Sequence, residues 1–326
     1  MPMHTAPSVG RRKALLAGAA SLLPLRAHAS DAWPARPLRI IVPFAPGGPA
    51  DGSARVLAEA MAPQLGQNIV VENRPGAAGM IGITAAAQSK DAHTLLMGST
   101  SMVVTPSLNP NTTYDVFRDF DPIGMVSAQP LVLVVAATSS IRSVPDLVAE
   151  ARGGRTSFGN SGNGTLAHLT AELFAMQAGV TIVSVPYKGE SALMPDLIAG
   201  TVSAGFINLP SVLPQARAGK LRPIAVSTAQ PIAELPGVPP FKAAGIANLE
   251  VQGWAALLAA KGVPPEGLAR VEAQLAAALA SDTVKKRFAD FGVTPVTSSR
   301  AGLTDYLKSE ATRWGNVVRS RGLRAE

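Results

Sequence analysis

Short apolar runs alternate with helical patterns in the N-terminal half of the chain. Residues 38–44 (LRIIVPF) form a β-branched apolar run that predicts a buried strand. Residues 51–65 place apolar side chains at the i, i+3, i+4 spacing of an amphipathic helix. Two more strands are predicted at 69–72 and 94–98, with a helix of small residues from about 75 to 89 between them. This alternation predicts parallel strands joined by right-handed crossovers.

The pattern changes after residue 120 and predicts a second α/β unit. Strands at 122–125 and 131–136 have little helix between them. Pro195 is expected to delay or kink its helix, because proline has no N–H to donate. The tail is predicted to be mostly helical, with a helix that starts at 264–265 (PP). The other predicted elements are helices at 146–152, 165–178 and 191–199, and strands at 156–159, 181–185, 202–207 and 221–227.

These two units follow each other without a low-complexity linker. Two lobes that are crossed several times by the chain are therefore expected, and a cleft between lobes is the usual place for a ligand. The length of 326 residues fits two lobes.

Residues 1–29 have the order of regions that is typical of an export signal. A basic stretch at 11–13 (RRK) precedes a short apolar run, Ala14–Leu25, and 27–29 (AHA) fits the small-x-small rule, which predicts cleavage before Ser30. The apolar run is shorter than the ~20 residues that a membrane span needs. The Arg-Arg pair hints at twin-arginine export, but Ala14 stands where a phenylalanine is usual, so the export route stays open. A buried N-terminal helix is the alternative.

Composition then limits the possible chemistry. The whole chain has 29 Lys and Arg against 22 Asp and Glu, a net charge of +7 that by itself indicates an anionic partner. The export segment carries four of the basic residues and no acid, so the remainder has 25 basic and 22 acidic side chains, a net charge of +3. This value, the 5% aromatic content and the lack of a basic run argue against nucleic acid. After the export segment the sequence has no run of 18 apolar residues, so no membrane span is predicted.

Two residue types exclude further classes of site. Cysteine is absent, which excludes disulfides, CxxC redox sites, zinc ribbons and thiol nucleophiles. Only His93 and His168 follow the export segment, and no HExxH or calcium-loop spacing occurs. No metal site is expected.

The loop at 43–51 (PFAPGGPAD) joins the first predicted strand to its helix. Gly47 and Gly48 let a ligand approach backbone N–H groups closely, and the helix start carries a partial positive charge that favours anions. Asp51 is placed to cap this helix. A capping role alone is the alternative to a carboxylate that accepts a hydrogen bond from a ligand amine or a water.

A second glycine-rich loop at 158–165 (FGNSGNGT) also joins a strand to a helix. Thr165 is a good N-cap, and His168 falls at the third helical position, from which it can reach back to the capping turn. An ordinary helix-terminal histidine is the alternative.

A third stretch, 185–189 (VPYKG), ends a predicted strand of the second unit. Its Tyr187 and Lys188 lie where open α/β sheets bind ligands. A solvated surface charge is the more common role of a lysine such as Lys188.

Two enzyme motifs match weakly. Residues 162–167 (GNGTLA) fit the dinucleotide pattern GxGxxA, but the expected acid is missing unless Glu190, about 26 residues after Gly164, serves. Ser161 and His168 supply two members of a hydrolase triad, but no GxSxG motif is present.

Several motifs in order resemble the extracytoplasmic solute receptors of tripartite tricarboxylate transporters, the family that includes the Bordetella uptake-gene receptors. The resemblance covers essentially the whole chain after the export segment. Its motifs are RPLRIIVPFAPGGPAD (36–51), IVVENRPGAAGMIG (69–82), TLLMGS (94–99), FGNSGNGTLAHLTAELF (158–174), VPYKG (185–189), INLPSVLPQARAGKLRPIAV (207–226) and LLAAKGVPPEGLARV (257–271).

The resemblance implies an α/β, type II periplasmic binding-protein fold with a ligand cleft between two lobes, each a sheet flanked by helices. Lobe I would comprise 30–128 and 227–326, and lobe II 129–226. In this family one ligand carboxylate is held between the first strand–helix loop and the glycine-rich loop of the second lobe, partly through ordered waters. The ligand-binding residues implied here are Phe44, Gly47, Gly48, Asp51, Ser99, Asn160, Ser161, Gly162, Gly164, Thr165, His168, Tyr187 and Asn208.

The implied function is to capture a small di-, tri- or aromatic carboxylate in the periplasm and deliver it to membrane permease subunits. No cofactor, metal or catalytic residue is expected, and the mature chain is expected to be a monomer without a membrane anchor. The alternatives are a secreted α/β hydrolase that uses Ser161 and His168, and a ligand sensor for a signalling partner.

Two departures from the family pattern bear on the ligand. Pro49 and Ala50 lie between Gly48 and Asp51, which stiffens the first turn. Ile207 stands where the family often has an aspartate, which favours a plain or aromatic carboxylate over a ligand with an amine.

Overall fold

The computed structural model describes residues 1–3, 33–154, 156–290 and 292–324. The chain divides into two units, Met1–Ala32 and Trp33–Glu326. The described strands and helices all belong to the second unit. The export signal predicted at 1–29 lies outside the described residues, except for Met1–Met3. Within the described residues, no helix combines the length and the apolar character needed to cross a membrane.

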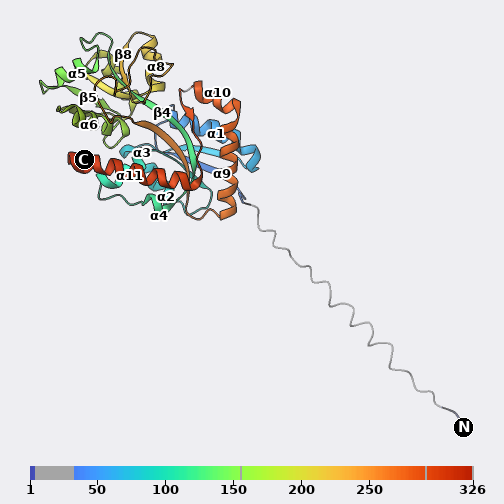
Figure 1. The fold of residues 1–326 in the computed structure, drawn as a ribbon. Coiled ribbons are helices and arrows are strands. Elements are labelled where there is room, and N and C mark those ends of the chain that lie inside the picture. The colour runs from blue at the N-terminus through green and yellow to red at the C-terminus, as the bar shows by residue number, and fades with distance from the viewer. Residues whose placement is uncertain (4–32, 155, 291, 325–326) are drawn as a thin grey trace. The chain divides into compact units, whose positions relative to one another are not determined.

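Strands and helices alternate through the second unit, as Figure 1 shows. The strands are β1 Leu38–Val42, β2 Ile69–Asn73, β3 Thr94–Gly98, β4 Phe120–Ala136, β5 Ser157–Asn160, β6 Val183–Pro186, β7 Ala204–Asn208, β8 Leu221–Val226, β9 Gln252–Ala260 and β10 Thr294–Pro295. The α-helices are α1 Pro49–Leu65, α2 Met80–Ala87, α3 Thr100–Leu108, α4 Val116–Asp119, α5 Val144–Ala151, α6 Leu166–Ala178, α7 Glu190–Ala199, α8 Leu209–Arg217, α9 Pro265–Ala280, α10 Asp282–Asp290 and α11 Arg300–Arg321. A 3-10 turn, Ala77–Gly79, precedes α2.

Two sheets share one strand. The first sheet runs β2-β1-β3-β9-β4, and β1 is parallel to both β2 and β3, as the sequence predicts. The second sheet runs β4-β7-β5-β6, with β8 also paired to β4, and β5 is parallel to β6 and β7. Strand β4 therefore belongs to both.

The prediction of two separate strands at 122–125 and 131–136 is wrong, because β4 is a single strand of 17 residues. Its first part, to Pro130, pairs with β9, and from Leu131 onward it pairs with β7. Residues 126–130, between the two predicted strands, belong to the same strand, and β4 has register shifts between Pro122 and Gly124 and between Met125 and Ser127.

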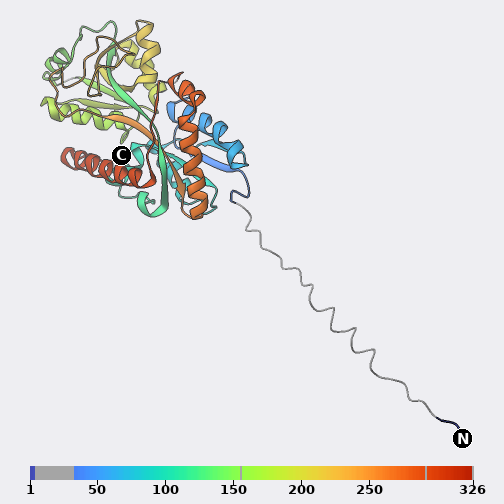
Figure 2. The same cartoon turned by 45° about the vertical axis from the view of Figure 1, so that its right-hand side comes forward.

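Helices cover both faces of the first sheet. Alternate residues of β1 point to opposite sides, so Leu38, Ile40 and Val42 pack in a core with α1 and α9. Ile41 faces a second core that contains side chains of α2, α3 and α11. Figures 1 and 2 show α9 and α11 on opposite sides of the strands.

The same second core continues into the other sheet without a break. Phe158 of β5, Phe174 of α6 and Phe206 of β7 belong to it, with ring centroids 5.6 to 6.1 Å apart. The opposite face of the second sheet packs on α7 and α8 through a separate cluster that includes Leu193, Leu197 and Val212. Each sheet is thus a middle layer between helices.

The structure contains five elements that the sequence pattern did not indicate: α3, α4, α8, β9 and β10. The expected delay of the helix at Pro195 is also wrong, because α7 begins at Glu190 and runs through this proline. The lost N–H of Pro195 costs one hydrogen bond near the helix start, and burial of Leu193 and Leu197 on either side offsets this cost.

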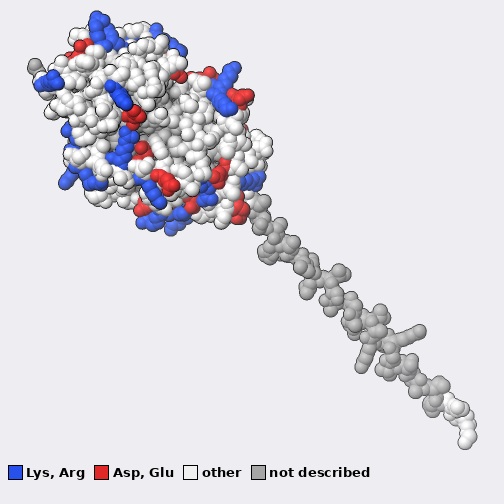
Figure 3. Space-filling view, in the orientation of Figure 1, with Lys and Arg blue, Asp and Glu red and all other residues white. Residues whose placement is uncertain are grey.

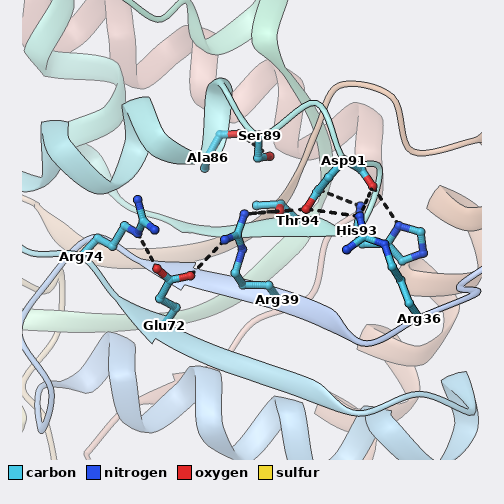
Figure 4. Close-up of polar contacts among 9 residues, drawn as sticks. All are labelled: Arg36, Arg39, Glu72, Arg74, Ala86, Ser89, Asp91, His93 and Thr94. Carbon is cyan, nitrogen blue, oxygen red and sulfur yellow. Dashed lines mark hydrogen bonds and ion pairs between the residues drawn. The ribbon is translucent and has the colours of Figure 1, made fainter.

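Charged side chains form a network on β1, β2 and the segment before β3 (Figure 4). Arg39 lies between Glu72 and Asp91, at 3.2 Å and 3.8 Å, and donates to Thr94 at 2.9 Å. Arg74 pairs with Glu72 from the other side. These half-exposed pairs contribute little stability individually, and no predicted site residue takes part in them.

Helix α11 packs against α3 and also against α6, so it contacts helices of both sheets. An ion pair anchors its end, because Arg321 Nη2 lies 2.8 Å from Glu172 Oε2 of α6. The Glu172 side chain is 8% exposed, whereas that of Arg321 is 30% exposed. The pair therefore neutralises an acid that is largely removed from water.

We expect Arg321→Ala to lower the free energy of unfolding by about 2 kcal/mol, because it leaves a buried carboxylate without its cation. The double variant Arg321→Ala with Glu172→Gln should recover part of this loss. Arg319→Ala, at an exposed position of the same helix, should change stability by less than about 0.5 kcal/mol. Urea unfolding measures all three, and equal losses in R321A and R319A would contradict the assignment.

Candidate functional site

The predicted site residues gather at the carboxyl ends of parallel strands. In the first sheet β1 lies beside β3, so the loop after Val42 and Ser99, which follows Gly98, lie at one edge. In the second sheet Asn160, Tyr187 and Asn208 end or follow the parallel strands β5, β6 and β7. Ligands of open α/β sheets bind at such edges.

The first loop presents backbone N–H groups at the start of α1. Gly47 has a φ of +87°, a conformation that glycine adopts readily. Gly48 is the N-cap, and it has no side chain to accept from the first helical N–H groups. Pro49 occupies the first helical position, where its missing N–H costs nothing.

Asp51 is not the N-cap that the sequence predicts. It is the third helical residue, and its Oδ2 reaches back to accept from Gly47 N–H at 3.0 Å. Arg55, one turn later, donates to the same carboxylate at 3.1 Å. Burial alone would raise the pKa of Asp51, but the hydrogen bonds from Arg55 and Gly47 outweigh it and hold the pKa below its ordinary value. Asp51 is thus a buried anion that fixes the loop.

Asn73, at the end of β2, holds this loop in place, and the sequence analysis did not predict it. Its Nδ2 donates to the Phe44 carbonyl at 3.1 Å, and its Oδ1 accepts from Arg55 at 3.2 Å. The only signal for it was its place inside the 69–82 motif. Phe44 itself is half-buried and packs against the core beneath α1.

Ser99 is the N-cap of α3, yet its hydroxyl does not cap the helix. Its Oγ is buried and has no hydrogen-bond partner in the described part of the chain. A buried hydroxyl without a partner carries a desolvation cost of about 1–3 kcal/mol. It is therefore free to bond a group that enters this edge.

The second loop is held by its own side chains. Asn160 accepts from Gly162 N–H at 2.9 Å and donates to Ser184 Oγ at 2.9 Å. Thr165 donates to the Gly162 carbonyl at 2.7 Å and is the N-cap of α6, as the sequence predicts. Ser161 Oγ donates to Thr165 Oγ1 at 3.3 Å. The loop is therefore shaped before any ligand arrives.

His168 lies at the third position of α6, as the sequence predicts, and reaches back to this loop. It is 6% exposed, and its Nδ1 accepts from Gly164 N–H at 3.1 Å. Nδ1 can accept only when it carries no proton, so the ring is neutral with its proton on Nε2. Burial lowers the pKa of His168, and the nearby Glu172 opposes this shift in part.

Tyr187 and Asn208 are engaged by neighbouring side chains. The Tyr187 hydroxyl donates to Asp196 of α7 at 2.6 Å, a bond that, with burial, raises the pKa of Tyr187 to about 12. Asn208 Nδ2 donates to Glu190 at 2.7 Å. Lys188 is exposed, in line with a surface charge.

The second loop contacts α3 at Gly164. This residue has a φ of +82°, and a Cβ placed on it would lie 2.5 Å from Leu108 Cδ1 at the end of α3. The second loop thus touches the helix that Ser99 begins. Only glycine fits here, because both the conformation and the contact exclude a side chain.

Two cavities, of about 280 Å³ and about 300 Å³, lie elsewhere, and Tyr306 of α11 lines both of them. The first is lined by Glu310, which accepts from both Trp254 and Trp314 indole N–H groups, and the second by Trp254 and residues 296–298. None of the predicted site residues lines either cavity.

The hydrolase alternative needs a hydrogen bond between Ser161 and His168. Ser161 Oγ bonds Thr165, and the Nδ1 of His168 bonds a backbone N–H, so the described hydrogen bonds do not pair the two residues.

Among the residues that the structure describes, no group of three or more His, Asp or Glu side chains could hold a metal ion. Figure 3 shows basic and acidic side chains interspersed over the described face that it presents.

The comparisons with known proteins identify the family. The model of the tripartite tricarboxylate transporter family receptor matches residues 53–323. The chain belongs to this family. BugT of Bordetella pertussis is 39% identical over 298 residues, which cover 90% of this chain and 91% of BugT.

Solved structures agree with this family and with the predicted fold. The periplasmic binding protein BugD is 29% identical, with a TM-score of 0.82, over 90% of this chain and 100% of BugD. Rpa4515 of R. palustris with adipate is 32% identical, with a TM-score of 0.83, over 90% of this chain and 99% of that protein. The receptor therefore has the α/β periplasmic binding-protein fold.

The receptor should lose stability in acid through His168. The unfolded chain takes up a proton near the ordinary pKa of 6.5, whereas the folded chain does so only at lower pH. The free energy of unfolding therefore falls as the pH drops below about 6.5. His168→Asn keeps an acceptor for Gly164 N–H and cannot take up this proton.

Urea unfolding at about pH 7.5 and about pH 5 measures this effect. H168N should lose less stability than the wild type between the two pH values. An equal loss in H168N and the wild type would contradict a neutral, buried His168.

Proposed function

We propose that this receptor captures a small carboxylate in the periplasm and delivers it to the permease subunits of a tripartite tricarboxylate transporter. The observation that carries the proposal is the pair of glycine-containing loops that open α1 and α6 at the carboxyl ends of parallel strands. Each helix start carries a partial positive charge, and the glycines leave room for an anion to approach the backbone N–H groups that the loop side chains do not occupy. The family and the structure of Rpa4515 with adipate support a carboxylate.

The ligand-binding residues of this proposal are those expected from the sequence. They are Phe44, Gly47, Gly48, Asp51, Ser99, Asn160, Ser161, Gly162, Gly164, Thr165, His168, Tyr187 and Asn208. Most act through the loop backbone, because the side chains of Asp51, Asn160 and Thr165 are used to hold the loops. The Ser99 hydroxyl and His168 Nε2–H are the side-chain donors that these bonds leave over.

Two lobes would close on the ligand, with boundaries at 30–128 plus 227–326 and at 129–226. Support comes from β4, which changes its partner from β9 to β7 between Pro130 and Leu131. The chain returns near Ser227, which is bonded to both Leu131 and Val251. Contacts of the ligand with both lobes would favour the closed state.

The proposed ligand is a plain or aromatic carboxylate without an amine. Ile207, at the position where an acid would accept from an amine, is fully buried in the core of the second sheet. The exported chain would act as a monomer without a cofactor and without catalysis. A receptor that reports to a signalling partner would use the same site.

A thermal-shift screen of the chain from Ser30 onward tests the proposal. Adipate, succinate, glutarate, citrate and benzoate are compared with adipamide and glutamate at equal concentration. At least one plain carboxylate should raise the melting temperature, since a ligand at 100 times its Kd adds about 2.7 kcal/mol, and adipamide should not. Preference for glutamate over its deaminated analogue would contradict the ligand class.

Three variants extend this test. Ser99→Ala should weaken carboxylate binding by about 3-fold to 10-fold, since it removes one donor, whereas Ser309→Ala on the exposed side of α11 should not. Ester turnover that disappears in Ser161→Ala would overturn the receptor in favour of the hydrolase.

A further inference from the structure

Three helix starts lie at the same edge of the second sheet. Strands β5, β6 and β7 are followed at their carboxyl ends by α6, α7 and α8. β5 is parallel to both of the others, with Asn160 beside Pro186 and Gly159 beside Gly205. All three helix starts therefore favour an anion at one edge.

The start of α8 already holds a carboxylate of the chain itself. Glu190, the first residue of α7, places Oε1 3.0 Å from Asn208 N–H and 2.7 Å from Asn208 Nδ2. Its Oε2 accepts from Ser211 Oγ at 2.6 Å. Asn208 is the N-cap of α8, but its side chain does not cap the helix. Glu190 thus supplies the cap from another helix.

The partners of Glu190 are those that a ligand carboxylate would need. A backbone N–H, an amide and a hydroxyl donate to it, and none of the described ion pairs includes Glu190. Burial raises the pKa of Glu190, while the bonds from Ser211 and Asn208 oppose this shift. The pKa that results is raised, and the described partners of the carboxylate are neutral donors rather than a cation.

Asn208 is fixed from its other side as well. Its Oδ1 accepts from Gln129 Nε2 at 3.2 Å, and Gln129 pairs with Gly253 just before β4 changes partner. A Cβ on Gly253 would lie 3.0 Å from Asn208 Oδ1. With both ends of its amide held, Asn208 keeps its Nδ2 directed at Glu190.

We propose that Glu190 is a specificity-determining residue of the receptor. Its carboxylate fills the anion-accepting start of α8, so a ligand carboxylate is left with the start of α6 at this edge. The negative charge of Glu190 also disfavours a second ligand carboxylate here. The inference rests on the proposed function, because it assigns the charge that the ligand presents to the second sheet.

Chemical rescue tests whether the start of α8 accepts an anion. Glu190→Ala removes the carboxylate, and formate is small enough to replace it. Sodium formate should raise the melting temperature of E190A along a saturating curve, by more than it does for the wild type, E190Q or the matched control Glu150→Ala. A formate response of E190A no larger than that of E150A would overturn the proposal.

A second variant tests the specificity and covers the case that E190A does not fold. Glu190→Gln keeps the side-chain size and removes the charge. Calorimetry with adipate and adipamate, which has one neutral amide in place of a carboxylate, should show the preference for adipate rising about threefold or more in E190Q and unchanged in E150Q. An unchanged preference in E190Q would contradict the assignment.

The failure of the two proposals can be told apart. A wild-type protein that binds no carboxylate contradicts the proposed function, and formate rescue still decides whether Glu190 fills the start of α8. A wild type that binds adipate, with equal preferences in E190Q and E150Q, contradicts the role of Glu190 alone.

Discussion

Strand β4 is the element on which the rest of the molecule depends, because it belongs to both sheets. Its first part pairs with β9 and its last part with β7 and β8, so the two sheets share one continuous backbone. The core that contains Ile41 and Phe206 runs past this strand from one sheet to the other, and α11 packs on it. Each sheet therefore has its own layers of helices, and the shared strand β4 links the two edges that carry the loops.

The loops at these edges satisfy backbone N–H groups near the helix starts with few charged side chains. Helix starts leave backbone N–H groups unsatisfied, and each loop satisfies some of them with a side chain of its own chain. Asp51 accepts from Gly47, His168 from Gly164, and Glu190 from Asn208. Among the described residues Ser99 Oγ has no hydrogen-bond partner, and the glycines leave room near the N–H groups that remain unbonded. The net charge of the chain matters less than these local donors.

Local chemistry explains which features the sequence could predict. Strand and helix periodicity predicted β1, β3, α1 and α6, and the N-cap Thr165 with its His168 was confirmed. Periodicity could not reveal that β4 is continuous, because the polar residues and Pro130 between the two predicted strands interrupt the apolar pattern. Helix α3, which has Pro106 inside it, was not predicted. Contacts such as Glu190 with Asn208 join residues 18 apart, and no local pattern encodes them.

A crystal structure of the chain from Ser30 onward with a bound dicarboxylate tests the central claim most directly. The account predicts ligand carboxylate oxygens about 2.7–3.1 Å from backbone N–H groups at the starts of α1 and α6, with Ser99 Oγ bonded to the ligand and Glu190 still on Asn208. A ligand held by Arg or Lys side chains, or seated in the cavities beside Tyr306, would contradict it.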